Sequence, residues 1–173
     1  ADGWDANRPW NLLVQQTLMA SFSWTERASP DGPTYWTDGW DGYPAARQRL
    51  LGEIARRNQP GVVVLGGDVH TNYVADLRLD AADTSAPVIA TEFCGTSITS
   101  LSMAQSRIDA ARVFNPHIRY GRSDQRGYMR FALGASELQV QLRVVDNVLD
   151  PSSGITTAAR FRVDATRSGA VPT

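Results

Sequence analysis

The chain has 173 residues, of which 42% are apolar and 20% charged, a composition typical of one soluble globular domain with a proper core. Its formal net charge of -1 gives no general attraction to nucleic acid or to anionic lipid. No apolar run approaches the roughly 18 residues needed to span a bilayer. The single cysteine, Cys94, excludes an internal disulfide.

The first third of the chain predicts a strand, a loop and a helix. Residues 10–24 are mostly apolar and lack Gly and Pro, which favours a buried strand that leads into a less regular stretch. Residues 29–43 combine turn formers with four aromatic rings and predict an ordered loop that lines a cleft. Residues 44–58 predict a helix, with Pro44 in its first turn and Asn58 at its end.

The remainder alternates between apolar runs and turn residues. It predicts strands at 62–65, 73–79 and 87–93, a helix at 100–114, and strands at 127–134, 138–146 and 159–164. Gly134 to Ser136 would form a hairpin turn between the fourth and fifth strands. The tail from Ala165 onward is expected to fray.

The segment "VVVLGGDVHTN", residues 62–72, carries the strongest chemical signal. A strand buried on both faces delivers the residues that follow it to the rim of the sheet, where α/β proteins usually bind ligands. Asp68 and His70 are two residues apart, and in an extended segment that spacing sends both side chains to one side. A carboxylate and an imidazole aimed at one point suit a metal ion or a pair of ions. An N-cap aspartate beside a surface histidine explains the same letters about equally well.

Five blocks in the same order resemble a known family: "WNLLVQQTLM", "DGWDGYPAARQRLL", "LGGDVHTNYVADL", "TEFCGTSITS" and "NPHIRYGRSDQRGYMR". Together they are similar to the C-terminal half of the catalytic domain of the alkaline phosphatase D, or PhoD-like, metallophosphoesterases. That family includes a metal-dependent Streptomyces phospholipase D. The resemblance covers roughly residues 8–146, so residues 1–173 are interpreted as the C-terminal portion of one catalytic domain whose N-terminal portion is absent.

The resemblance implies a fold and a metal site. The fold would be α/β, half of a two-sheet sandwich with flanking helices and a β-rich C-terminal part. His70 would match a ligand of trivalent iron and Asp68 a ligand of a neighbouring calcium ion, with zinc or manganese as other candidates. Cys94 stands where the family carries an aliphatic residue, so it is not taken for a metal ligand. Two ligands are too few for two metals.

Three further residues are candidates for catalysis. Asn72 would serve the metal ligands or the substrate. Arg47 would bind phosphate, or lie on the surface of the predicted helix. His117 would polarise a leaving group, or form a hydrogen bond within a loop. Glu92 and Arg126 are expected to hold each other or the backbone rather than the substrate.

The resulting hypothesis is a phosphoric ester hydrolase, an alkaline phosphatase or phosphodiesterase or a phospholipase D, in which a metal-bound hydroxide attacks phosphorus. The chain would supply part of that site and would bind the N-terminal fragment of the same enzyme and a phosphate ester or phospholipid. Secretion by a bacterium is implied by the family alone. A non-catalytic β-rich binding domain and a hydrolase with a mononuclear zinc site remain alternatives.

Overall fold

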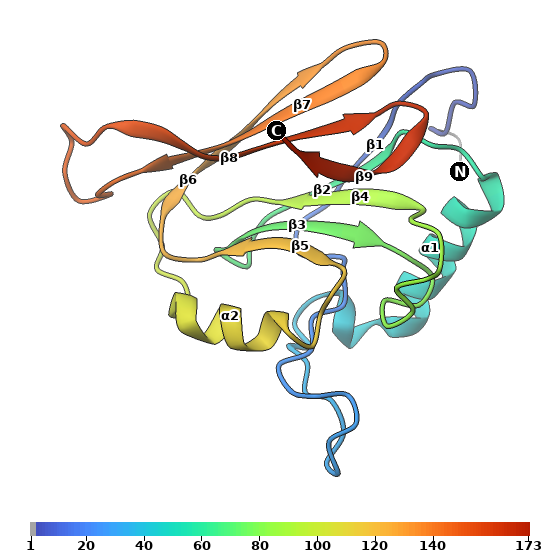
Figure 1. Ribbon diagram of the computed structural model, residues 1–173, viewed down its shortest axis with the longest axis horizontal. Helices are drawn as coiled ribbons and strands as arrows, with labels where there is room; N and C mark the ends of the chain where they lie inside the picture. Colours follow the sequence, from blue (N-terminus) through green and yellow to red (C-terminus); the bar gives the residue numbers. More distant parts are fainter. Residues whose placement is uncertain (1–2) are drawn as a thin grey trace.

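The computed structural model describes residues 3–173, which form two stacked β-sheets with helices beneath them (Figure 1). The larger sheet has the order β1-β2-β4-β3-β5, and the smaller, antiparallel sheet has the order β6-β7-β8-β9. The strands are β1 (Asn11–Val14), β2 (Val62–Gly66), β3 (Asn72–Leu77), β4 (Ala90–Cys94), β5 (Ile118–Arg122), β6 (Arg126–Leu133), β7 (Glu137–Val145), β8 (Ile155–Asp164) and β9 (Arg167–Pro172). The helices are α1 (Pro44–Arg57), α2 (Gln105–Arg112) and the short 3₁₀ helix η1 (Trp40–Gly42). This is the two-sheet α/β arrangement that was predicted.

Strand β2 packs against helix α1 on one face and against the smaller sheet on the other. Side chains alternate between the two faces of a strand. Val62 and Val64 therefore pack with Leu51 and Ile54 of α1, whereas Val63 points the other way into a second core with the strands of the smaller sheet. All three valines are at most 1% exposed, so β2 is an inner strand of the larger sheet and is buried between two cores.

The pairing directions bring several chain segments to one edge of the larger sheet. Strands β1, β2 and β4 are parallel, so their carboxyl ends lie at the same edge. Strand β3 is antiparallel to β4 and therefore begins at that edge. The residues that follow β2 must cross the end of β4 to reach β3.

The predicted strand at 10–24 is shorter than expected. Only Asn11–Val14 pairs with β2, at the edge of the sheet, and Leu12 and Val14 are 46% and 73% exposed. The following segment, residues 15–24, has no regular structure, although Met19 and Phe22 lie in the core. The lack of a second neighbour strand explains the exposure of a sequence that looks fully buried.

The helix predicted at 100–114 begins five residues later. The carbonyl of Leu101 and the hydroxyl of Ser102 form hydrogen bonds to His70 and Thr71, respectively, and these contacts hold the segment away from a helical path. Helix α1 agrees with the prediction, beginning at Pro44 and ending where Asn58 adopts φ 47°. Within residues 3–173, no helix has both the length and the hydropathy of a membrane span.

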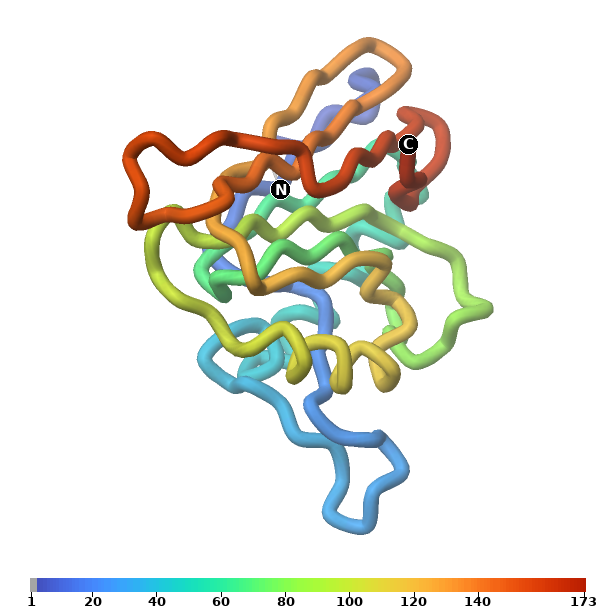
Figure 2. Tube along the Cα trace, turned by 60° about the vertical axis from the view of Figure 1, so that its left-hand side comes forward, coloured from blue at the N-terminus to red at the C-terminus, as the bar shows by residue number. Residues whose placement is uncertain are grey.

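The expectation of a frayed tail from Ala165 is wrong, because Arg167–Pro172 forms β9. The turn that precedes β9 is stabilised locally: the carboxylate of Asp164 accepts hydrogen bonds from the backbone N–H and the hydroxyl of Thr166, both at 2.7 Å. The backbone N–H of Gly169 then donates to the hydroxyl of Thr91 in β4, and Ala170 joins the core between the sheets. Figure 2 shows this last strand returning over the larger sheet, with the segment around residues 25–34 projecting from the opposite side.

Candidate functional site

The loop that connects β2 to β3, residues 67–71, lies across the end of β4. The N–H of Gly95, just after β4, donates to the carbonyl of Gly66 at 3.0 Å. The hydroxyl of Thr96 donates to the carbonyl of His70 at 3.0 Å. The loop is therefore held from below by the residues that follow the neighbouring strand.

The two glycines of the motif differ in whether the surrounding space requires glycine. A Cβ on Gly66 would collide with the carbonyl oxygen of Thr17 and lie 2.7 Å from the side-chain nitrogen of Gln15. A Cβ on Gly67 would meet nothing closer than 3.7 Å. Only Gly66 is demanded by space, because the chain after β1 passes directly against it.

Asp68 and His70 do not lie in an extended segment, which the two-residue spacing had suggested. Both adopt the left-handed conformation, with φ 64° and 56°. This conformation is uncommon for residues other than glycine and tends to occur where function has selected it. The sharp path follows from the need to cross the end of β4 in five residues.

The hydrogen bond of His70 fixes which of its ring nitrogens is free. Nδ1 lies 2.9 Å from the carbonyl oxygen of Leu101. Because a carbonyl can only accept, Nδ1 carries the proton and Nε2 presents a lone pair. A backbone carbonyl that orients an imidazole in this way is the usual support of a metal-binding histidine.

Asp68 and His70 line one cavity of about 790 Å³, together with the residue between them, Val69. Its remaining wall is largely aromatic and comes from the segment 18–24, the loop 34–41 and the segment 101–107. We call it the aromatic cleft, after its six rings Phe22, Trp24, Tyr35, Trp36, Trp40 and Tyr73. The prediction that the loop at 29–43 lines a cleft is thus confirmed.

Two other residues of this edge are buried and already bonded. Asn72 is 2% exposed, and its side-chain oxygen accepts a hydrogen bond from the N–H of Thr96 at 3.1 Å. Cys94 is fully buried, and its thiol donates to the carbonyl of Gly67 at 3.3 Å. Burial, with the nearby charges of Glu92 and Asp68, raises the pKa of the Cys94 thiol well above its ordinary value. Cys94 is therefore a protonated core residue.

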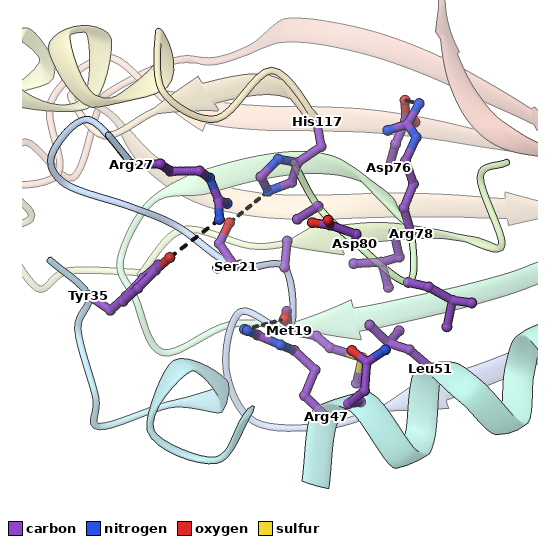
Figure 3. Close-up of a pocket in the computed structure, with 15 residues that line it drawn as sticks. Met19, Ser21, Arg27, Tyr35, Arg47, Leu51, Asp76, Arg78, Asp80 and His117 are labelled. Carbon is purple, nitrogen blue, oxygen red and sulfur yellow. Dashed lines mark hydrogen bonds and ion pairs between the residues drawn. The ribbon is translucent and has the colours of Figure 1, made fainter. Parts of the chain in front are cut away.

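Arg47 and His117 lie in a different cavity, of about 380 Å³, which Figure 3 shows. His117 is 1% exposed, and its Nε2 donates to the carbonyl of Ser21 at 2.7 Å. Burial lowers the pKa of His117, against the raising effect of this bond. The structure does not bring His117 into the aromatic cleft.

Arg47 is a buried ion-pair partner rather than a surface arginine. Its guanidinium lies 2.5 Å from the carboxylate of Asp41, and the two side chains are only 15% and 9% exposed. The other oxygen of Asp41 accepts from the N–H of Phe22 at 2.9 Å. This pair therefore fastens α1 to the segment that forms the wall of the aromatic cleft.

Glu92 binds the backbone of the irregular segment 15–24, a partner that the sequence did not identify. The residue is fully buried, and its two oxygens accept hydrogen bonds from the N–H groups of Met19 and Ala20 at 2.6 and 2.7 Å. Burial raises the pKa of Glu92 to about 7, against the lowering effect of these two bonds. Arg126 instead donates to the carbonyls of Ser100 and Ser123. Glu92 and Arg126 therefore bind the backbone, as expected. The sequence signal for the buried role of Glu92 was an acidic residue within an apolar strand.

Within residues 3–173, no three His, Cys, Asp or Glu side chains gather closely enough to hold a metal ion. Asp68 and His70 are thus a pair of donors on one loop. A protein site for zinc takes four ligands and one for calcium takes six to eight. The pair fits part of a metal site.

Two stacked sheets with a Gly-Asp-x-His loop at the carboxyl end of an inner strand, β2, define a two-sheet α/β sandwich with a candidate site at the edge of its larger sheet. The chain belongs to the PhoD-like phosphatase family, whose family model matches residues 4–142. The predicted family is confirmed.

Two relatives support this assignment. Alkaline phosphatase D of Bacillus subtilis (strain 168) is 38% identical over 163 residues, which are 92% of this chain. A solved structure described as the structure of PhoD superposes with a TM-score of 0.86 at 34% identity and covers 95% of this chain. The chain spans 27% of the length of the first relative and 31% of the second.

Proposed function

We propose that the intact protein is a metal-dependent phosphoric ester hydrolase and that this chain contributes Asp68 and His70 to its metal site. One observation carries the proposal: both side chains line the same cavity, and His70 presents a free Nε2 because Leu101 holds its other nitrogen. Membership of the PhoD-like phosphatase family supports the reaction class. The substrates would be phosphomonoesters or phosphodiesters, including phospholipid head groups as in a phospholipase D.

We propose a dinuclear site on the family resemblance, since one imidazole and one carboxylate fit a dinuclear or a mononuclear site. An imidazole nitrogen suits iron or zinc, whereas a carboxylate also suits calcium or manganese. We assign His70 to a trivalent iron and Asp68 to calcium on the family resemblance. The chemistry that such ions supply when bound is acidification of a water molecule to hydroxide and neutralisation of charge on the phosphoryl oxygens.

The remaining candidates would act through position. Asn72 holds Thr96, which in turn holds the carbonyl of His70. His117 and Arg47 bond to the carbonyls of Ser21 and Met19, on the segment that separates the two cavities. We propose that these three residues shape the site without contacting the phosphoryl group.

The other ligands would come from a partner portion of the same enzyme. The chain spans less than a third of the length of the relatives it matches. The free edge of β1, with Leu12 and Val14 exposed, offers a place for that portion to pair. Export from the cell would follow from the family and is part of the proposal.

Metal analysis combined with an isosteric substitution tests the proposal. In the intact protein, Asp68→Asn should lower kcat/KM for 4-nitrophenyl phosphate by about 100-fold or more and reduce the bound metal measured by elemental analysis. Asp146→Asn, an exposed change after β7 at a distance from the cleft, is the matched control. Unchanged activity and metal content in Asp68→Asn would contradict the proposal. Stoichiometric zinc without calcium would favour the mononuclear alternative, and no bound metal would favour a non-catalytic domain.

A further inference from the structure

The aromatic cleft has more ring surface than the candidate metal ligands beside it require. Six rings line one cavity of about 790 Å³, and they come from the segment 22–24, the loop 35–40 and β3. Ligand cavities are typically lined by apolar and aromatic side chains with a few polar groups that fix orientation. Asp68 and His70 are such polar groups, at one side of the cleft.

Several rings are fixed from behind, so they form a rigid wall. Phe22 and Tyr73 are 5% and 3% exposed, and their ring centroids are 5.2 Å apart. Trp24 meets Phe22 edge to face at 4.8 Å. The indole N–H of Trp40 donates to the side chain of Gln15 at 2.9 Å. Packing and hydrogen bonding explain these rings.

Trp36 is the exception. It is 42% exposed, while the indoles of Trp4, Trp10 and Trp40 each donate a hydrogen bond. In the part of the chain that the structure describes, the indoles of Trp24 and Trp36 have no such bond, but Trp24 packs against Phe22 and Arg107, whereas Trp36 is the most exposed of the tryptophans. A large ring that folding leaves open, on the wall of a cleft, is suited to binding a flat ligand surface.

The charges around the cleft limit what else the ligand carries. Asp38 and Asp68 line it, and Arg107 is already stacked on Trp24 with its guanidinium carbon 5.0 Å from the ring centre. A third carboxylate of the lining, Asp41, is paired with Arg47, so two free carboxylates against one engaged arginine give no attraction for a second anionic group. The part of the ligand beyond the phosphoryl group is therefore not anionic.

We infer that the aromatic cleft binds the organic group of the substrate and selects esters in which that group is a planar ring without negative charge, stacked on Trp36. This inference rests on the proposed function, because it takes the phosphoryl group to lie beside Asp68 and His70. It names Trp36 as a specificity-determining residue. Edge-on or offset stacking between two rings changes binding by about three- to tenfold.

Two phosphonates of equal charge test the inference on the intact protein. Phenylphosphonate should inhibit hydrolysis of 4-nitrophenyl phosphate more strongly than methylphosphonate, and Trp36→Ala should reduce that ratio of inhibition constants by about three- to tenfold. Trp36→Phe, which keeps a ring, should retain most of the ratio. Leu149→Ala changes an apolar residue that is 89% exposed outside the cleft and should leave the ratio unchanged.

The inference is overturned if Trp36→Ala has the same ratio as the unmodified protein, or if hexylphosphonate inhibits as strongly as phenylphosphonate. The first result removes Trp36 from the site, and the second replaces stacking by simple apolar contact. Calorimetric binding of the two phosphonates gives the same ratio without turnover. An inactive protein that still prefers phenylphosphonate would thus contradict the proposed function and not the cleft.

Discussion

The two cavities differ in what their histidines have left to offer. His70 gives Nδ1 to a carbonyl and keeps Nε2 free at the rim of an open cleft. His117 gives Nε2 to a carbonyl, is 1% exposed, and has its pKa lowered by burial. The same residue type with the same kind of partner is therefore available for chemistry at one place and is used for folding at the other. The orientation of the ring and its burial decide between them.

The largest expected effect is that substitution of His70 lowers activity, whereas substitution of His117 lowers stability. His70→Ala should lower kcat/KM by about 100-fold or more, with little change in the free energy of unfolding, because it removes a ligand from a half-buried loop. His117→Ala should destabilise the protein by about 2 kcal/mol, because it leaves the carbonyl of Ser21 without its buried donor and opens a cavity. Steady-state kinetics and denaturant unfolding of the intact protein measure both. A large loss of kcat/KM in a stable His117→Ala would break the comparison.

Gly66, at the end of β2, and Gly67, at the start of the loop, are expected to differ in how well they tolerate a side chain. Gly66→Ala should cost about 1–3 kcal/mol, because its Cβ would meet the backbone of Thr17, which cannot move aside cheaply. Gly67→Ala has room and should change stability by less than about 0.5 kcal/mol. Urea unfolding of the two variants measures the difference. Equal destabilisation would show that the loop, rather than the contact with Thr17, demands glycine.

Glu92 gives an effect of another kind, a dependence of stability on pH. Because burial raises the pKa of Glu92 from 4.5 to about 7, the folded state binds more protons than the unfolded state between these values. Its contribution to stability is present below about pH 4.5 and is lost as the pH rises through about 7.

Glu92→Gln should remove that slope, which is on the order of 2–3 kcal/mol between about pH 5 and 8. The substitution also replaces one of the two oxygens that accept hydrogen bonds from Met19 and Ala20 by an amide nitrogen, which changes the level of the curve but not its slope. Unfolding free energies of both proteins across this range give the slopes. Parallel curves would show that another group carries the dependence.

The sequence predicted what depends on local pattern. The period of the apolar residues located β2 and α1, and the turn residues located the hairpin between β6 and β7. The Gly-Asp-x-His motif located the loop that carries Asp68 and His70, although its left-handed backbone was not expected. Strand β9 pairs with β8, its neighbour in the chain, and was missed because its sequence RSGAVP contains Gly and Pro and lacks a regular alternation of apolar residues.

The division of the site into two cavities had no local signal. His117 and Arg47 lie within the blocks that resemble the family. Their partners, Ser21 and Asp41, lie outside the regular strands and the longer helices. Glu92 was visible as an acid in an apolar strand, yet its partners belong to the irregular segment 15–24. Long-range contacts of an irregular segment are what a pattern of single residues does not contain.

The burial of β2 between two cores also fixes where the loop after it begins. A slip of β2 by one residue would turn Val63 toward α1 and place its neighbours between the sheets, so both cores would be mispacked at once. Few other registers are accessible to a strand clamped on two sides. The loop that carries Asp68 and His70 therefore begins from a strand whose register is fixed on both faces.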